Sequence, residues 1–153
     1  GAFGQGAAGL GVLTAAAGAG ALVSAMLKAW GAGAAGASIP RSVLAAMFLG
    51  FAAVTGMGLA PVWPLALLAT ALAGFTATLC GVSLQAAIQT DLPDAYRGRV
   101  MSLWTVVGVG AVAIGAGLIG ALAELFGIGP ALVIAGCIGL FGTALWRIGG
   151  ARG

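Results

Sequence analysis

Charged residues are so few in this sequence that their scarcity decides what the chain can fold into. Its 153 residues include six Lys or Arg and three Asp or Glu, and 61% of all residues are hydrophobic. A water-soluble domain carries roughly 25% charged residues, and a disordered chain is more polar still. The sequence therefore excludes both classes and indicates an integral membrane protein surrounded by membrane lipid.

The charges also divide the chain into apolar runs. A helix that crosses the hydrocarbon core needs about 20 residues. The run 42–90 has room for two such helices around a Gly- and Pro-containing turn signal at 56–64, whereas 29–40 is short and predicts a loop. The fold class is therefore an all-α membrane protein with five transmembrane helices, predicted near residues 6–28, 42–60, 64–90, 101–124 and 128–147.

The basic residues predict how these helices are oriented. Five helices place alternate loops on opposite sides of the membrane. All six basic residues then fall on one side, in the loops 28–41 and 91–99 and the tail from Arg147. Basic loops stay in the cytoplasm, so the amino end is expected outside and the carboxyl end inside. A net charge of +3, spread in this way, does not indicate a nucleic-acid partner.

The third predicted helix carries a polar stripe. Its members are three or four residues apart and share one helix face. A Gln inside a membrane is costly unless its amide finds partners. The amides could therefore bond neighbouring helices, or they could line a water-filled substrate path, and the sequence leaves both interpretations open. The candidates for the path are Thr70, Thr78, Gln85 and Gln89, with Gly74 and Gly81 between them.

A second stripe of small residues follows the fourth predicted helix and includes Gly110, Gly117 and Gly120. Small residues let membrane helices approach closely. We predict a helix-packing face here; the alternative is a face that slides against a neighbour during transport.

Catalytic and metal-binding sets are missing from the sequence. It has no His, and its two cysteines, Cys80 and Cys137, lie in apolar runs. A Cys/His metal site would need several such ligands close together. No enzyme activity, metal or other cofactor is therefore expected.

The most specific motif spans residues 89–103. It contains a Gln, then Pro93 and Asp94, then Arg97-Gly98-Arg99 and Met101. This pattern resembles the cytoplasmic loop between helices ten and eleven of major facilitator superfamily transporters, in particular bacterial efflux permeases of the enterobactin-exporter branch. The resemblance implies that the five helices match helices eight to twelve of a twelve-helix fold. Residues 1–153 would then form a partial carboxyl-terminal bundle, and the chain, which starts at Gly1 without an initiator Met, is expected to be a fragment lacking the amino-terminal half.

The same resemblance implies a function. The chain would be part of a secondary active transporter in the bacterial inner membrane, exporting small molecules, drugs or siderophores by alternating access and drawing on the proton gradient. Its partners would be the small-molecule substrate and the missing half of the transporter. The alternative is a non-transporting five-helix membrane assembly module.

The charged loop of the motif has two interpretations. It could act as an interdomain latch that closes the cytoplasmic side, as the resemblance implies for at least one arginine. It could instead be a solvated loop that only sets topology, since exposed ion pairs contribute little. The residues concerned are Asp91, Asp94, Arg97 and Arg99.

Overall fold

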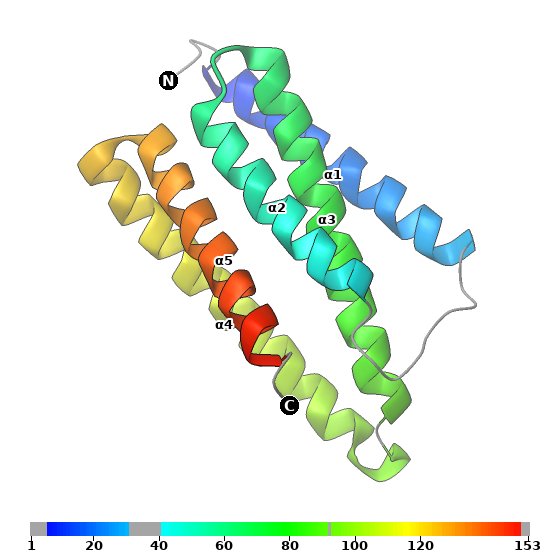
Figure 1. Ribbon diagram of the computed structural model, residues 1–153. Helices are drawn as coiled ribbons and strands as arrows, with labels where there is room; N and C mark the ends of the chain where they lie inside the picture. Colours follow the sequence, from blue (N-terminus) through cyan, green and yellow to red (C-terminus); the bar gives the residue numbers. More distant parts are fainter. Residues whose placement is uncertain (1–5, 31–40, 92, 151–153) are drawn as a thin grey trace.

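The computed structural model describes residues 6–30, 41–91 and 93–150, and these form five helices. The helices run alternately up and down (Figure 1). The predicted all-α fold with five helices is therefore confirmed. The predicted loop 29–40 lies outside the described residues from residue 31 onward. The helices are α1 (Gly6–Trp30), α2 (Arg41–Leu59), α3 (Trp63–Asp91), α4 (Asp94–Phe126) and α5 (Ile128–Gly150).

Helix length separates α2 from the other four. By length and composition, α1, α3, α4 and α5 can each cross a membrane. The apolar part of α2, Val43–Leu59, is shorter. At 1.5 Å per residue it measures about 26 Å, against a hydrocarbon core of about 30 Å. Four long apolar helices support an integral membrane protein, and the crossing of α2 stays a prediction.

Proline and glycine mark where these helices begin and end. Pro93 directly precedes α4, while Pro64 and Pro130 stand in the first turns of α3 and α5. Proline fits there because the first amide groups of a helix have no intrahelical partner. Gly127 separates α4 from α5 with a φ of 86°, and its N–H donates to the Ala123 carbonyl at 2.9 Å. That backbone conformation is open to glycine and costly for other residues.

Packing places α2 at the centre of the molecule. It contacts α3 on one side and α5 on the other, while α1 packs on α3 and α4 packs on α5 (Figure 1). The two outermost helices in this order are thus α1 and α4. The buried hydrophobic residues are small, being Val43, Ala46, Ala53, Ala66 and Ala131. This suits a membrane protein, whose helices are held by close approach rather than by withdrawal of large side chains from water.

Glycines make the closest approaches between helices. A Cβ added to Gly20 would overlap the Ala71 carbonyl, and one added to Gly74 would overlap the backbone of Ala17. The contact between α1 and α3 therefore has no room for a methyl group at either position.

The contact between α2 and α5 is built in the same way. A Cβ at Gly136 would overlap the Thr55 hydroxyl, and one at Gly139 would overlap the Phe51 ring. Of these close-contact glycines, Gly74 alone belongs to a stripe that the sequence analysis singled out.

The α3–α4 hairpin extends beyond the rest of the molecule. Helix α3 has 29 residues and α4 has 33, so they measure about 44 Å and about 50 Å. Both exceed the hydrocarbon core of about 30 Å. Figure 1 shows the turn between them projecting below the ends of α2 and α5. Each helix is therefore longer than an upright crossing of that core needs.

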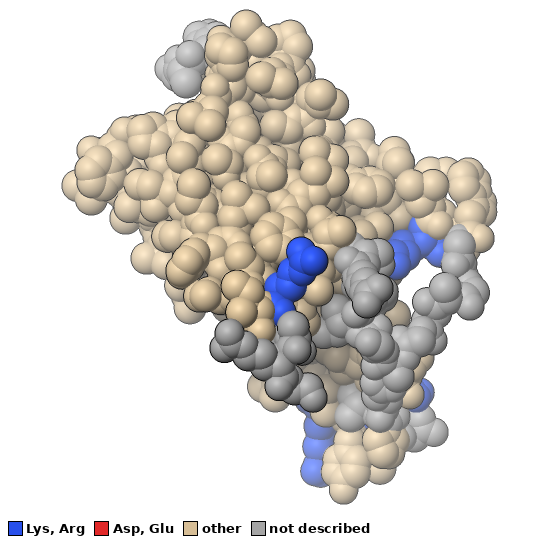
Figure 2. Space-filling view, in the orientation of Figure 1, with Lys and Arg blue, Asp and Glu red and all other residues tan. Residues whose placement is uncertain are grey.

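This end of the molecule is also the basic end. Lys28 lies in the last turn of α1 and Arg147 in the last turn of α5, while Arg97 and Arg99 lie near the start of α4. Figure 2 shows Lys and Arg atoms in the middle and lower parts of the view and none at its upper end. Glu124 lies at the opposite end, in the last turn of α4. The charge separation expected from the sequence therefore holds for the described residues.

Candidate functional site

The α3 stripe begins in helix contacts, and we call Thr70 and Gly74 its packed half. The Thr70 hydroxyl donates to the Ala66 carbonyl at 2.7 Å and lies 3.3 Å from the Met57 sulfur of α2. Gly74 touches the backbone of α1. The hydroxyl of Thr70 is thus engaged at the α2–α3 contact.

The stripe then leaves these contacts, and we call Gly81, Gln85 and Gln89 its open half. A Cβ at Gly81 would meet nothing within 4 Å, and both glutamines are exposed. Thr78 stands at the boundary and is half-buried. The change follows the geometry of α1, which packs on α3 around Gly74 and then diverges from it toward the basic end (Figure 1).

Helix geometry fixes the direction of Gln85. It lies eleven residues after Gly74, close to three full turns, so both residues share one face of α3. Because Gly74 faces α1, Gln85 lies on the α1 side of α3 as well. An amide exposed at membrane depth needs water or a partner from another element. This arrangement suits a path lined by water.

The sequence analysis missed Ser24 of α1. Its side chain is 0% exposed, and within the described part of the chain its hydroxyl has no hydrogen-bond partner. It follows Gly20 by four residues and so lies on the α3-facing side of α1. Its spacing of four residues from Gly20 could have indicated a buried position. Many alanines and glycines of α1 have the same spacing, so the pattern did not single out Ser24.

Arg97 ties the two helices of the hairpin together. Its Nη2 donates to the carbonyl oxygen of Gln89 at 3.4 Å, across the α3–α4 turn. Gln89 lies in the last turn of α3, where the helix dipole favours a cation. The Gln89 amide reaches the Met101 sulfur of α4 at 4.0 Å. Of the four predicted latch residues, Arg97 therefore contacts the end of α3 from α4, and its part in a latch stays a prediction.

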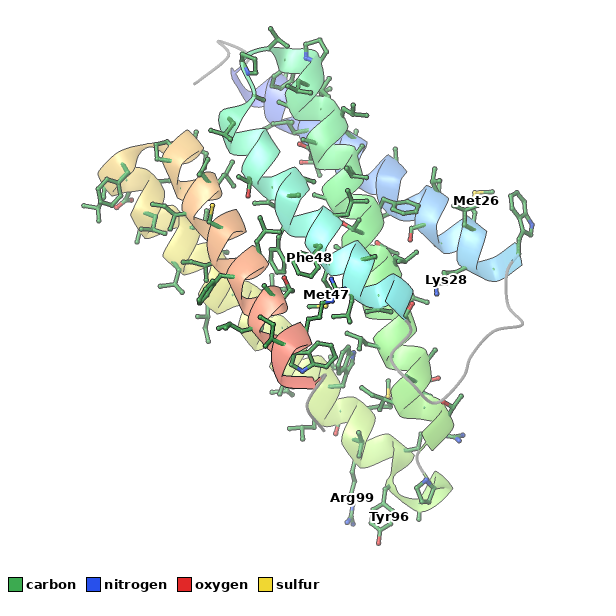
Figure 3. All side chains as sticks on the ribbon, in the orientation of Figure 1. Met26, Lys28, Met47, Phe48, Tyr96 and Arg99 are labelled. Carbon is green, nitrogen blue, oxygen red and sulfur yellow. The ribbon has the colours of Figure 1, made fainter. Side chains whose placement is uncertain are left out.

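The other latch residues are placed less completely. Asp91 ends α3 and Asp94 begins α4, but their side chains lie outside what the structure describes, so their ion pairs stay a prediction. Arg99 is exposed, and in Figure 3 it extends from the lower end of α4 beside Tyr96, away from the helices.

The predicted packing glycines of α4 contact no neighbour in the described chain. A Cβ at Gly110, Gly117 or Gly120 would meet nothing within 4 Å. Helix α4 packs mainly on α5, touches α3 at the hairpin, and leaves most of its surface exposed. Their packing role therefore stays a prediction, and it would require a helix that is not among the described residues.

Residues 6–30, 41–91 and 93–150 contain no cluster of three His, Cys, Asp or Glu side chains that could hold a metal ion. What the site offers is polar groups along a membrane-length helix and a basic hairpin at its end. The class of protein this defines is an integral membrane protein with an exposed polar helix face.

The sequence relatives of this chain are enterobactin exporters, which are members of the major facilitator superfamily. Over 75 residues, 49% of this chain, it is 37% identical to the enterobactin exporter EntS of Citrobacter koseri. Over the same length it is 36% identical to EntS of Escherichia coli O1:K1 / APEC and of Shigella flexneri. The resemblance indicated by the Arg-Gly-Arg motif is therefore confirmed.

The match covers only part of those relatives. The aligned segment is 18% of the length of each, so the chain matches under a fifth of an exporter. No protein-family profile matches the chain, and no solved structure matches it. The relatives are exporters rather than enzymes, which agrees with the lack of a catalytic set in the sequence.

Proposed function

We propose that this chain is part of a secondary active transporter that exports small molecules. The similarity to enterobactin exporters carries the proposal, because export is what those relatives are named for. The substrates would be siderophores or other small amphipathic molecules, including drugs. The energy would come from the proton gradient, as the family resemblance implies.

In this proposal the five helices correspond to helices eight to twelve of a major facilitator fold, and α2 crosses the membrane with the others. The basic end, with Lys28, Arg97 and Arg147, faces the cytoplasm of a bacterial cell, and the membrane is the inner one. The amino end of the chain then lies outside and its carboxyl end inside. The collection of basic residues at one end supports this orientation.

Alternating access requires a second helix bundle that rocks against this one. The open face of α4 supports such a partner, because its glycines have free space while those of the α1–α3 and α2–α5 contacts have none. We propose that an amino-terminal half of the same transporter covers this face.

The substrate path would follow the α3 stripe. Thr78 and Gln85 line it, Gln89 stands at its cytoplasmic mouth, and Thr70 lies toward the outer end. The exposure of Gln85 on the α1 side of α3 supports this path. The hairpin residues Asp91, Asp94, Arg97 and Arg99 would form the latch that closes the cytoplasmic side.

Flux through proteoliposomes tests the proposal. The 153 residues alone should give no more flux than empty liposomes, whereas a longer chain that adds an amino-terminal bundle should export a catecholate siderophore or a cationic dye when a proton gradient is applied. Gradient-dependent flux from the 153 residues alone would contradict the need for a second bundle. A well-folded longer chain that moves none of these compounds would favour the assembly-module alternative.

A further inference from the structure

A groove at the basic end lies over α2, between α3 and α5. Its volume is about 270 Å³, and its lining residues are Val43, Met47, Leu84, Gly142, Thr143 and Trp146. Thr143 is the only hydroxyl among them, and it already donates to the carbonyls of Gly139 and Leu140 at 3.0 and 2.9 Å. The groove therefore offers its occupant an apolar surface.

The groove is accessible from outside the molecule. A Cβ at Gly142 would meet nothing within 4 Å, and Trp146 is 53% exposed. Its volume is slightly below the 300–1,000 Å³ typical of pockets for drug-sized ligands. A groove of this size and chemistry suits a stretch of hydrocarbon chain.

A positive charge lies one helical turn beyond the α5 residues that line this groove. Arg147 follows the lining Thr143 by four residues, so both lie on the same face of α5. It is exposed and lies in the last turn, at the basic end. Its neighbour Trp146 is of the residue type that collects at the level of lipid headgroups. A guanidinium binds phosphate through two parallel hydrogen bonds.

We propose that this groove binds one anionic phospholipid of the surrounding leaflet, with an acyl chain against Met47, Leu84 and Trp146 and the phosphate on Arg147. Charge complementarity selects an anionic lipid, since this end of the molecule carries Lys28, Arg97, Arg99 and Arg147 against Asp91 and Asp94, while Glu124 lies at the opposite end. A hydrocarbon groove that ends in a cation matches an acyl chain that ends in a phosphate. The inference does not depend on transport.

Fluorescence quenching tests the site directly, because Trp146 lines it. Trp30, Trp63 and Trp104 are replaced by Phe, which leaves Trp146 as the only reporter. The chain is reconstituted in phosphatidylcholine vesicles containing a small fraction of phosphatidylglycerol or phosphatidylcholine with brominated acyl chains. Brominated phosphatidylglycerol should quench Trp146 at a roughly fivefold lower mole fraction, the effect of one basic residue on an anionic lipid.

Two variants separate the phosphate contact from the groove. Arg147→Gln should abolish the preference for phosphatidylglycerol, while Arg99→Gln, a matched loss of charge on the hairpin, should leave it unchanged. Gly142→Leu should fill the groove and reduce quenching by the anionic lipid, with helical content checked by circular dichroism.

Several results would overturn the proposal. Equal quenching by the two lipids, or an unchanged preference in Arg147→Gln, would mean ordinary boundary lipid. Undiminished quenching in folded Gly142→Leu would place the lipid outside the groove. Loss of the preference on adding millimolar inorganic phosphate would identify a free anion as the occupant.

Discussion

At the scale of single residues, Gln85 is the member of the proposed path that a substitution tests most directly. It lies on the face of α3 that contacts α1 at Gly74, yet it is exposed because α1 has diverged before reaching it. A polar side chain in that position either forms a hydrogen bond with a helix outside the described residues or contacts water. Loss of the amide would mainly lower folded yield in the first case and transport in the second.

We expect Gln85→Leu to lower flux strongly in the transport-competent longer protein and to leave folded yield near normal. Hydrogen bonds between membrane helices contribute only about 0.6 kcal/mol on average, so losing one should change the yield little. Flux and folded yield are measured side by side. Val82→Leu, an exposed apolar change on the same helix, is the control and should leave both near wild type.

Thiol labelling checks the same residue without relying on flux. A cysteine at position 85, with Cys80 and Cys137 replaced, should react with a water-soluble reagent, and substrate should slow the reaction. Absence of labelling in every condition would remove Gln85 from the path.

At the scale of elements, the α3–α4 hairpin gives Arg97 and Arg99 different environments, which the sequence did not predict. Arg97 bonds the Gln89 carbonyl in the last turn of α3, while Arg99 extends away from the helices. A hydrogen bond to a carbonyl at a helix end depends on the position of the guanidinium nitrogens, which a Lys ammonium does not reproduce. A topology signal depends only on positive charge.

We therefore expect Arg97→Lys to insert normally but transport poorly, with the cytoplasmic side more open, and Arg99→Lys to transport nearly as wild type. Flux and the accessibility of a cysteine near the hairpin are measured together. Wild-type flux from the double Lys variant would reduce the motif to a topology signal.

The two kinds of glycine give a second test at this scale. In the 153-residue chain, Gly136→Ala should lower the free energy of unfolding by about 1–3 kcal/mol, because its methyl group would overlap the Thr55 hydroxyl. Gly117→Ala has open space and should be neutral or stabilising by about 0.5–1 kcal/mol. Denaturation in detergent, followed by circular dichroism, measures both variants.

In the longer protein the Gly117 result should reverse, since a partner bundle would then contact α4. Gly117→Ala that stays neutral there would show that this face meets lipid rather than another helix.

At the scale of the whole molecule, the testable property is orientation. The alternating helices bring the basic residues to one end and the short connections at 60–62 and Gly127 to the other. Reporters fused after Ala60 and after Gly129 should therefore report the outer side. A cytoplasmic signal after Ala60 would mean that α2 does not cross the membrane. The fusion after Ala60 is the more informative of the two, because the apolar part of α2 is shorter than that of the other helices.

The sequence by itself determined the number and type of the helices, because those follow from local properties. Long apolar runs in lipid must satisfy their backbone groups internally, and so they form helices. Prolines such as Pro64 and Pro130 fit best in the first turn of a helix, where no intrahelical hydrogen bond is lost. Charge position is equally local, so the basic end could be predicted before any packing was known.

Only the tertiary structure decided which small residues make contacts. The glycines of α1, α3, α4 and α5 recur at similar spacings, yet Gly20 and Gly136 meet a neighbouring helix and Gly117 meets none. The same holds for the α3 stripe, whose packed half and open half have one periodicity. The point at which α1 leaves α3 separates the two halves. Helix crossing depends on how two distant surfaces fit, and no single helix sequence contains that information.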